Sequence, residues 1–154
     1  MELSEADLAA CCASRRWVAA VAGHADPDAL RAASKRVLDE LEWPDIEEAL
    51  AAHPRIGERP GGQGREAGWS RGEQSGMDGA GKEVRDAFIE GNRAYEERFG
   101  HVFLICASGR SALEMLAELR ERLENDARTE REVVRRELAA IVDLRLVKLA
   151  KEKG

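Results

Sequence analysis

Apolar residues recur at helical spacing along most of this chain, and one short segment has the composition of a strand. The helical pattern covers roughly residues 4–23, 27–43, 45–52, 84–100, 111–125 and 129 onwards. The strand-like segment is HVFLICA, residues 101–107, and no second strand candidate exists to pair with it. Its buried peptide groups need hydrogen-bond partners elsewhere, in the protein or in a ligand. The sequence therefore predicts an all-α fold with a buried, extended connector at 101–107.

Two short motifs predict where the first and last helices begin. Ser4 followed by Asp7 is typical of a capping box, and the helix that it opens is expected to reach Gly23. Thr129 followed by Glu132 has the same pattern and predicts the start of the last helix. The apolar residues of the last two helices are expected to face the core: Leu113, Leu116, Leu119, Leu123, Val134, Leu138, Ile141, Leu144 and Leu149.

The helical pattern stops between His53 and Gly81. This stretch contains Pro54, Pro60 and nine glycines, at positions 57, 61, 62, 64, 68, 72, 76, 79 and 81. It is expected to form one long loop, apart from a short helix that Ser70 could cap. A loop of this length inside a small domain is usually functional or disordered.

Length and charge exclude several classes of protein. The 154 residues, 44% of them hydrophobic, suit a single domain over residues 1–154. The net charge is −6, and the 24 basic residues are scattered among 30 acidic ones, which argues against a nucleic-acid partner. No apolar run approaches membrane-spanning length, so no membrane association is expected. Three cysteines without a disulfide pattern favour the cytoplasm.

His53 and Glu73 are a candidate acid/base pair, because both lie in polar, glycine-bearing segments rather than on an apolar helix face. An imidazole with a pKa near 6.5 can accept and donate a proton around neutrality. The structural alternatives are a His53 that interacts with the carbonyl end of its helix and a Glu73 that completes a capping box with Ser70. Both roles of Glu73 can coexist if a helix beginning at Ser70 directs its amides and Gln74 at an anionic ligand.

Arg145 lies among Leu144, Leu146 and Val147, near the apolar face of the last helix. A guanidinium in that place needs a carboxylate partner from the protein or from a substrate, unless its side chain extends to solvent. We expect no metal site, because His and Cys occur without H-x-x-x-H or C-x-x-C spacing. No cofactor fingerprint is present, because the glycine-rich stretch follows no strand and lacks G-x-x-x-x-G-K-[ST].

Five blocks in order give the chain a specific resemblance. They are HPRIG at residues 53–57, W-S-x-x-E-Q at 69–74, N-x-x-Y-x-x-R-F-G at 92–100, FLIC at 103–106 and LRL at 144–146. In this order they resemble the motifs of the 2-oxo-4-hydroxy-4-carboxy-5-ureidoimidazoline (OHCU) decarboxylase family, over a range from about Trp17 to the carboxyl end.

The resemblance implies an all-helical and usually dimeric enzyme that needs no cofactor and converts OHCU to (S)-allantoin. It implies that His53 is the acid/base residue and that Glu73 and Arg145 are also catalytic. The positions that it assigns to substrate binding are Pro54, Ser70, Arg71, Gly72, Gln74, Phe103, Leu104, Ile105, Cys106 and Ala107.

The chain departs from the usual family pattern at two places, and two rival functions remain. Residues 75–81 are richer in glycine than is usual in the family, and His101-Val102 stands where an aromatic residue and a proline are common. One rival is a helical interaction module in which the glycine-rich stretch is a docking surface. The other is a lyase of the same fold that acts on a related ureido-imidazoline or hydantoin.

Overall fold

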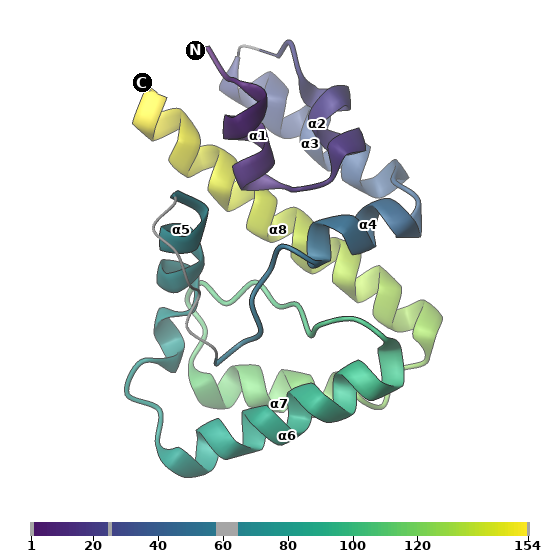
Figure 1. The fold of residues 1–154 in the computed structure, drawn as a ribbon, viewed down its shortest axis with the longest axis vertical. Coiled ribbons are helices and arrows are strands. Elements are labelled where there is room, and N and C mark those ends of the chain that lie inside the picture. Colours follow the sequence, from purple (N-terminus) through teal and green to yellow (C-terminus); the bar gives the residue numbers. More distant parts are fainter. Residues whose placement is uncertain (1, 25, 58–64, 154) are drawn as a thin grey trace. The chain divides into compact units, whose positions relative to one another are not determined.

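The computed structural model describes residues 2–24, 26–57 and 65–153, and within these ranges it is helical without a strand (Figure 1). The all-α prediction is confirmed. Chain contacts divide the protein into two units: residues 1–52 with 135–154, and residues 53–134. The single domain over residues 1–154 stays a prediction.

The first unit contains α1 (Glu5–Cys11), α2 (Arg15–Val21), α3 (Pro27–Glu40), α4 (Trp43–Leu50) and the larger part of α8 (Ala127–Lys153). Its hydrophobic core is drawn from all of these helices. The buried residues are Leu8, Cys11, Cys12, Trp17, Val21, Leu30, Ala33, Leu38, Leu41, Ile46, Ala49, Leu50, Leu138, Ile141, Val142, Leu146 and Leu149.

The capping box at the start of α1 is confirmed, because Ser4 Oγ accepts from Asp7 N and Asp7 Oδ2 accepts from Ser4 N. The helix does not continue to Gly23, and that prediction is wrong. It ends at Cys11, and α2 starts anew after Ser14, whose hydroxyl accepts a hydrogen bond from Trp17 N. A serine side chain that satisfies a free amide at this point favours a new helix start over continuation.

The second unit contains α5 (Arg65–Glu73), the 3₁₀ helix η1 (Ser75–Met77), α6 (Lys82–Phe99), α7 (Ala112–Arg122) and the first turns of α8. Gly100 ends α6 with a φ of 80°, a left-handed conformation that suits glycine. Helices α6 and α7 lie side by side (Figure 1). The core cluster of this unit consists of Ile56, Met77, Phe88, Tyr95, Phe103, Ile105, Ala107, Met115, Leu116 and Leu119.

The prediction of a long loop between His53 and Gly81 is wrong in part, because α5 and η1 lie within it. The part of the predicted loop at 58–64 lies outside the described residues. One face of α5 is buried. It carries Trp69, which is 9% exposed, Ser70, which is 4% exposed, and Glu73, which is 9% exposed, and these residues are spaced one and three positions apart, as on a helix. Burial of that face outweighs the low helix propensity of glycine.

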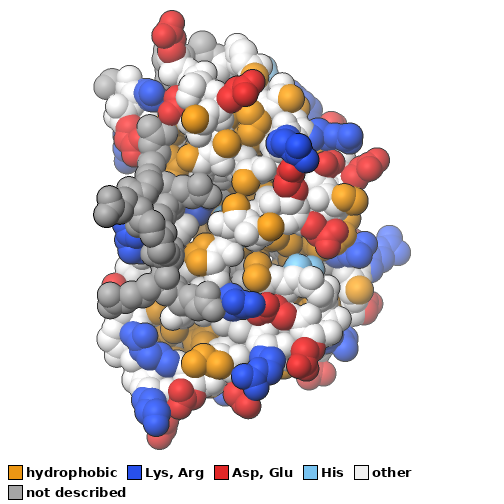
Figure 2. Space-filling model, in the orientation of Figure 1, with side chains coloured by type: hydrophobic (Ala, Val, Ile, Leu, Met, Phe, Trp, Pro, Cys, Tyr) orange, Lys and Arg blue, Asp and Glu red, His pale blue; other side chains and the backbone are white. Residues whose placement is uncertain are grey.

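Helix α8 begins earlier than predicted. Asp126 Oδ1 accepts from Thr129 N over 2.7 Å, so the capping side chain is Asp126, and the predicted box of Thr129 with Glu132 is wrong. Two leucines predicted to face the core are exposed instead, Leu113 to 67% and Leu144 to 37%. On the face drawn in Figure 2, basic and acidic side chains are interspersed.

Candidate functional site

His53 is half-buried and opens a turn, residues 53–57, in the second unit. Pro54 follows it, and Ile56 is buried in the core cluster. Gly57 has a φ of 94°, which favours glycine because other residues rarely adopt this conformation. The turn is therefore shaped by a proline at one end and a left-handed glycine at the other.

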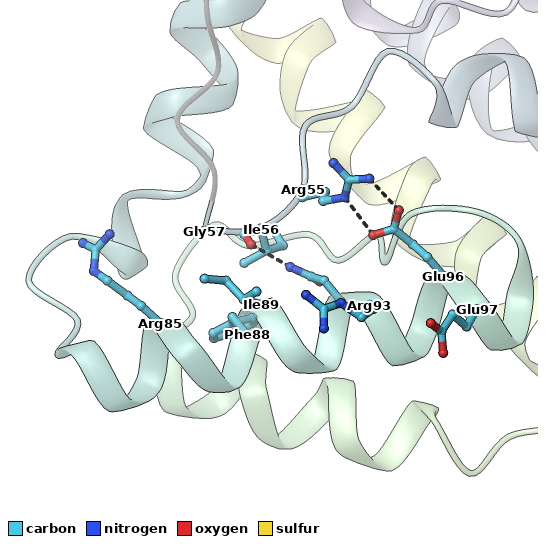
Figure 3. A pocket seen from close by; sticks show the side chains of 10 residues that line it. Arg55, Ile56, Gly57, Arg85, Phe88, Ile89, Arg93, Glu96 and Glu97 are labelled. Carbon is cyan, nitrogen blue, oxygen red and sulfur yellow. Dashed lines mark hydrogen bonds and ion pairs between the residues drawn. The ribbon is translucent and has the colours of Figure 1, made fainter.

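Helix α6 holds the turn from one side. Asn92 is buried, and its Nδ2 donates to Ile56 O over 3.0 Å. The Arg55 guanidinium forms two parallel hydrogen bonds of 2.8 Å to the Glu96 carboxylate (Figure 3). These contacts join positions 36 and 41 residues apart in the chain.

Gln74 holds the same turn from the end of α5. Its Oε1 accepts from Gly57 N over 3.2 Å, and its Nε2 donates to Arg55 O over 3.4 Å. Glu73, the residue before it, is the last residue of α5. The structure therefore brings the segment of Glu73 together with the segment of His53 through the Gln74 side chain.

The helix that carries Ser70 and Glu73 begins at Arg65, so the predicted cap at Ser70 is wrong. Both residues lie in the last two turns of α5, where a helix presents free carbonyl groups rather than free amides. The idea that a helix amino terminus at Ser70 directs amides at an anion is therefore also wrong. Arg71 and Gly72, on the same helix, are exposed.

The connector at 101–107 is largely buried and, within the described part of the chain, has no strand partner, as predicted. Phe103, Leu104, Ile105 and Ala107 are 2–4% exposed, and Cys106 is half-buried. One of its carbonyl groups, Leu104 O, accepts from Arg122 Nη1 over 2.8 Å. The protein therefore supplies one of the backbone partners that the sequence left open.

A buried ionic network contacts the connector at Phe103 and Leu104. Arg122 Nη2 and Glu130 Oε2 are 2.6 Å apart, with side chains 3% and 0% exposed. Tyr95 donates its hydroxyl to Glu130, and Asn125 Nδ2 donates to the same carboxylate over 3.1 Å. The Arg122 guanidinium also lies 4.5 Å from the centre of the Phe103 ring, a cation–π distance.

Burial, together with the hydrogen bond to Glu130, raises the pKa of the Tyr95 hydroxyl well above its usual range, so Tyr95 stays a neutral donor. Sequence reasoning missed Arg122 and Glu130 as a pair. Each sits in a helix rich in mixed charge, and no local pattern separates a buried ion pair from the exposed ones.

Arg145 is 2% exposed and belongs to the first unit. Its Nη1 donates to Ala10 O over 3.2 Å. Burial raises the pKa of the nearby Cys12 thiol to about 11, against the smaller opposing effects of a hydrogen bond from the backbone at Ser14 and of the positive charge of Arg145. The three cysteines form no disulfide.

A cavity of about 750 Å³ lies in the second unit along α6 (Figure 3). Its lining includes the 55–57 side of the turn, the apolar Phe88 and Ile89, and the charged Arg85 and Arg93. Among the residues that the structure describes, no group of three His, Cys, Asp or Glu side chains could hold a metal ion. Nor is any helix in those ranges long and apolar enough to cross a membrane.

Comparison with known proteins points to one family. A family model described as OHCU decarboxylase matches residues 2–147. The "2-oxo-4-hydroxy-4-carboxy-5-ureidoimidazoline decarboxylase" of Amia calva is 34% identical over 122 residues, which cover 76% of this chain and 68% of that protein.

Two further relatives agree. The "Uric acid degradation bifunctional protein TTL" of Arabidopsis thaliana is 32% identical over 160 residues. The match covers all of this chain but only about half, 49%, of that protein. A crystal structure of OHCU decarboxylase in the presence of (S)-allantoin superposes with a TM-score of 0.82 at 27% identity, over 96% of this chain and 98% of that one.

Proposed function

Because the chain belongs to the OHCU decarboxylase family, we propose that it converts OHCU to (S)-allantoin and carbon dioxide in uric acid degradation. The family match over residues 2–147 carries this proposal, since that range contains every residue to which a role is assigned below. The structural likeness to a decarboxylase crystallised in the presence of (S)-allantoin supports it.

The substrate itself can accept the electrons of the reaction. The bond between the carboxylate and the hydroxyl-bearing ring carbon breaks, and carbon dioxide leaves. The electron pair forms a double bond to the neighbouring ureido-bearing carbon, while the ring imine nitrogen takes up the displaced pair and a proton. The enol that results loses its hydroxyl proton, and the ureido-bearing carbon gains a proton on one face. A protein therefore needs to orient the carboxylate and manage protons.

His53 is proposed to transfer protons at the substrate hydroxyl and the enol. An imidazole suits this task because it exists in both protonation states near neutral pH. Delivery of the last proton to one face determines the S configuration. OHCU also decays without an enzyme, to racemic allantoin, so speed and stereochemical control are the expected contributions of the protein.

Glu73 is proposed to orient or polarise the reacting group, and Arg145 to bind polar or anionic groups of the substrate. The main-chain groups of residues 103–107 are proposed to hold the ring. The burial of the connector and the bond from Arg122 to Leu104 O support this role, because a fixed backbone can offer preorganised hydrogen bonds. Pro54, Ser70, Arg71 and Gly72 remain proposed lining residues.

The enzyme is further proposed to act as a homodimer in the cytoplasm. The family resemblance supports the dimer, and the number and spacing of the cysteines support the compartment. Sedimentation equilibrium of the purified chain tests the dimer: a mass near twice 17.0 kDa is expected, and a monomer mass contradicts it.

The function is tested by generating OHCU in place from urate with urate oxidase and hydroxyisourate hydrolase. Circular dichroism then follows the optical activity of allantoin with and without this protein. The (S)-allantoin signal is expected only with the protein, and His53→Asn is expected to lose about 10²–10⁴-fold in kcat. Racemic product at the spontaneous rate refutes the proposal, and activity on a hydantoin analogue alone favours the related lyase.

A further inference from the structure

The turn that follows His53 is held by its backbone at three consecutive residues. Gln74 accepts from Gly57 N over 3.2 Å and donates to Arg55 O over 3.4 Å. Asn92 donates to Ile56 O over 3.0 Å, and the Ile56 side chain is buried in the core cluster. Two side chains, Gln74 between α5 and η1 and Asn92 on α6, therefore fix the path of the chain just after His53.

This anchoring reaches His53 because few backbone torsions separate it from the fixed residues. The ring of Pro54 fixes its own φ near −65°. A residue that precedes proline is restricted to extended conformations, which limits the ψ of His53. The ψ of Pro54 and the φ and ψ of Arg55 are the main remaining backbone freedoms between His53 and the bonded Arg55 carbonyl. Fixing residues 55–57 therefore restricts the position of the His53 backbone, from which its side chain projects.

Gln74 is placed to couple this turn to Glu73, because it is the next residue in the chain. A movement of the end of α5 relative to the turn would break its two bonds. Its amide oxygen and amide nitrogen are both engaged with the turn. Each of the two groups keeps one further hydrogen-bonding position, a lone pair on Oε1 and an N–H on Nε2.

Asn92 contributes a single donor. Its side chain is 6% exposed, and within the described part of the chain its Oδ1 is buried without a hydrogen-bond partner. A buried oxygen in this state is unfavourable, so the useful feature of an amide here is its N–H group, which meets Ile56 O. The ion pair of Arg55 with Glu96, which is on the same helix as Asn92, is more exposed, with side chains 47% and 24% exposed, and such pairs contribute little.

We propose that Gln74 and Asn92 are positioning residues for the decarboxylation, because both bind the turn that follows His53. Together they hold the turn against the end of α5 and against α6, and so restrict where the His53 imidazole can lie. The proposal rests on the function proposed above for the role of His53.

The kinetic test compares Gln74→Met and Asn92→Leu with wild type on OHCU. Both replacements keep side-chain size and remove the bonds to the turn. A lower kcat by about tenfold to a hundredfold with KM within about twofold is expected, because misplacing a catalytic group by about 1 Å has effects of this size. Ser75→Ala is the matched control: the neighbouring side chain is exposed, and wild-type values are expected.

A raised KM with unchanged kcat for Gln74→Met would make Gln74 a substrate ligand and overturn the proposal. Wild-type kinetics for both variants would overturn it as well. Gln74 is only half-buried, so its variant is expected to fold even where Asn92→Leu does not.

An NMR measurement separates the failure of this proposal from failure of the proposed function. The chain has three histidines, so the imidazole signals can be assigned by substitution. Loss of the side-chain bonds of Gln74 or of Asn92 to the turn is expected to shift or broaden the His53 signal. The signal of His24, in the other unit, is expected to stay unchanged. This holds whether or not the wild type acts on OHCU. An unchanged His53 signal in Gln74→Met contradicts the proposed positioning role of Gln74.

Discussion

Replacing Arg122 by methionine tests the account of the connector. The change removes the cation from a pair whose side chains are 3% and 0% exposed, and leaves Glu130 buried. It also removes the donor to Leu104 O. Breaking a buried pair from one side costs about 3–5 kcal/mol, because the remaining charge is uncompensated. For a chain of this size the loss corresponds to a fall in Tm of roughly 6–20 °C.

Urea denaturation followed by circular dichroism measures the loss, and a double-mutant cycle identifies its source. Arg122→Met with Glu130→Leu removes both charges, so it is expected to be more stable than Arg122→Met alone, although Tyr95 and Leu104 O lose partners. Arg15→Met is the control, since that side chain is 93% exposed in its pair with Glu48 and a far smaller effect is expected.

Two results would refute the reasoning. One is a loss below about 1 kcal/mol for Arg122→Met, which is the range of surface pairs. The other is a double variant whose loss equals the sum of the two single losses, because residues that form a network should not be additive.

Three further predictions concern charge, backbone and thiols. The hydrogen bond from Arg31 lowers the pKa of Asp143 in the folded state. The ionised Asp143 therefore contributes its full stabilisation above the pKa of the unfolded chain, near 3.9, and this stabilisation is lost as the pH falls through the lower pKa of the folded state. Asp143→Asn is therefore expected to be less stable than wild type at pH 7, with a deficit that fades in urea titrations below about pH 4; a deficit independent of pH contradicts this. Gly57→Ala is expected to lower the free energy of unfolding by about 1–2 kcal/mol, because Gly57 has a left-handed φ of 94°. Gly72→Ala is expected to raise it by about 0.5–1 kcal/mol, because Gly72 lies in α5 and an added Cβ meets no atom within 4 Å. Changes of the same sign in urea titrations of the two variants contradict this. A thiol reagent at pH 8 is expected to modify only the half-buried Cys106 in the native protein and all three cysteines in guanidinium, and three equal native rates would contradict the burial of the other two.

The sequence predicted most of the helices because their signals are local. Ser4 with Asp7, Asp26 before Pro27, and Gly100 after α6 each act within one turn, and all three mark helix ends in the structure. The errors have local causes too. Ser14 and Asp126 are capping residues that compete with equally plausible neighbours. Helix α5 was obscured by its glycines, although the spacing of Trp69, Ser70 and Glu73 is helical.

The site was harder to predict because its supports join distant parts of the chain. His53, Glu73 and Arg145 were named from their local sequence context and from the motif order, and neither carries information on contacts. Asn92 meets Ile56 across 36 residues, and Arg122 meets Leu104 across 18. Gln74 was expected in the substrate pocket, and its bonds to the turn became evident only in the structure.

The central claim is that this chain accelerates the decarboxylation of OHCU, and release of the labelled carboxyl carbon tests it most directly. Urate carrying ¹³C at the carbon that becomes the OHCU carboxylate is converted in place, and ¹³C NMR follows the appearance of labelled carbon dioxide and bicarbonate. We expect release well above the buffer rate with wild type and near the buffer rate with His53→Asn. Release at the buffer rate with the folded wild-type protein would contradict the account.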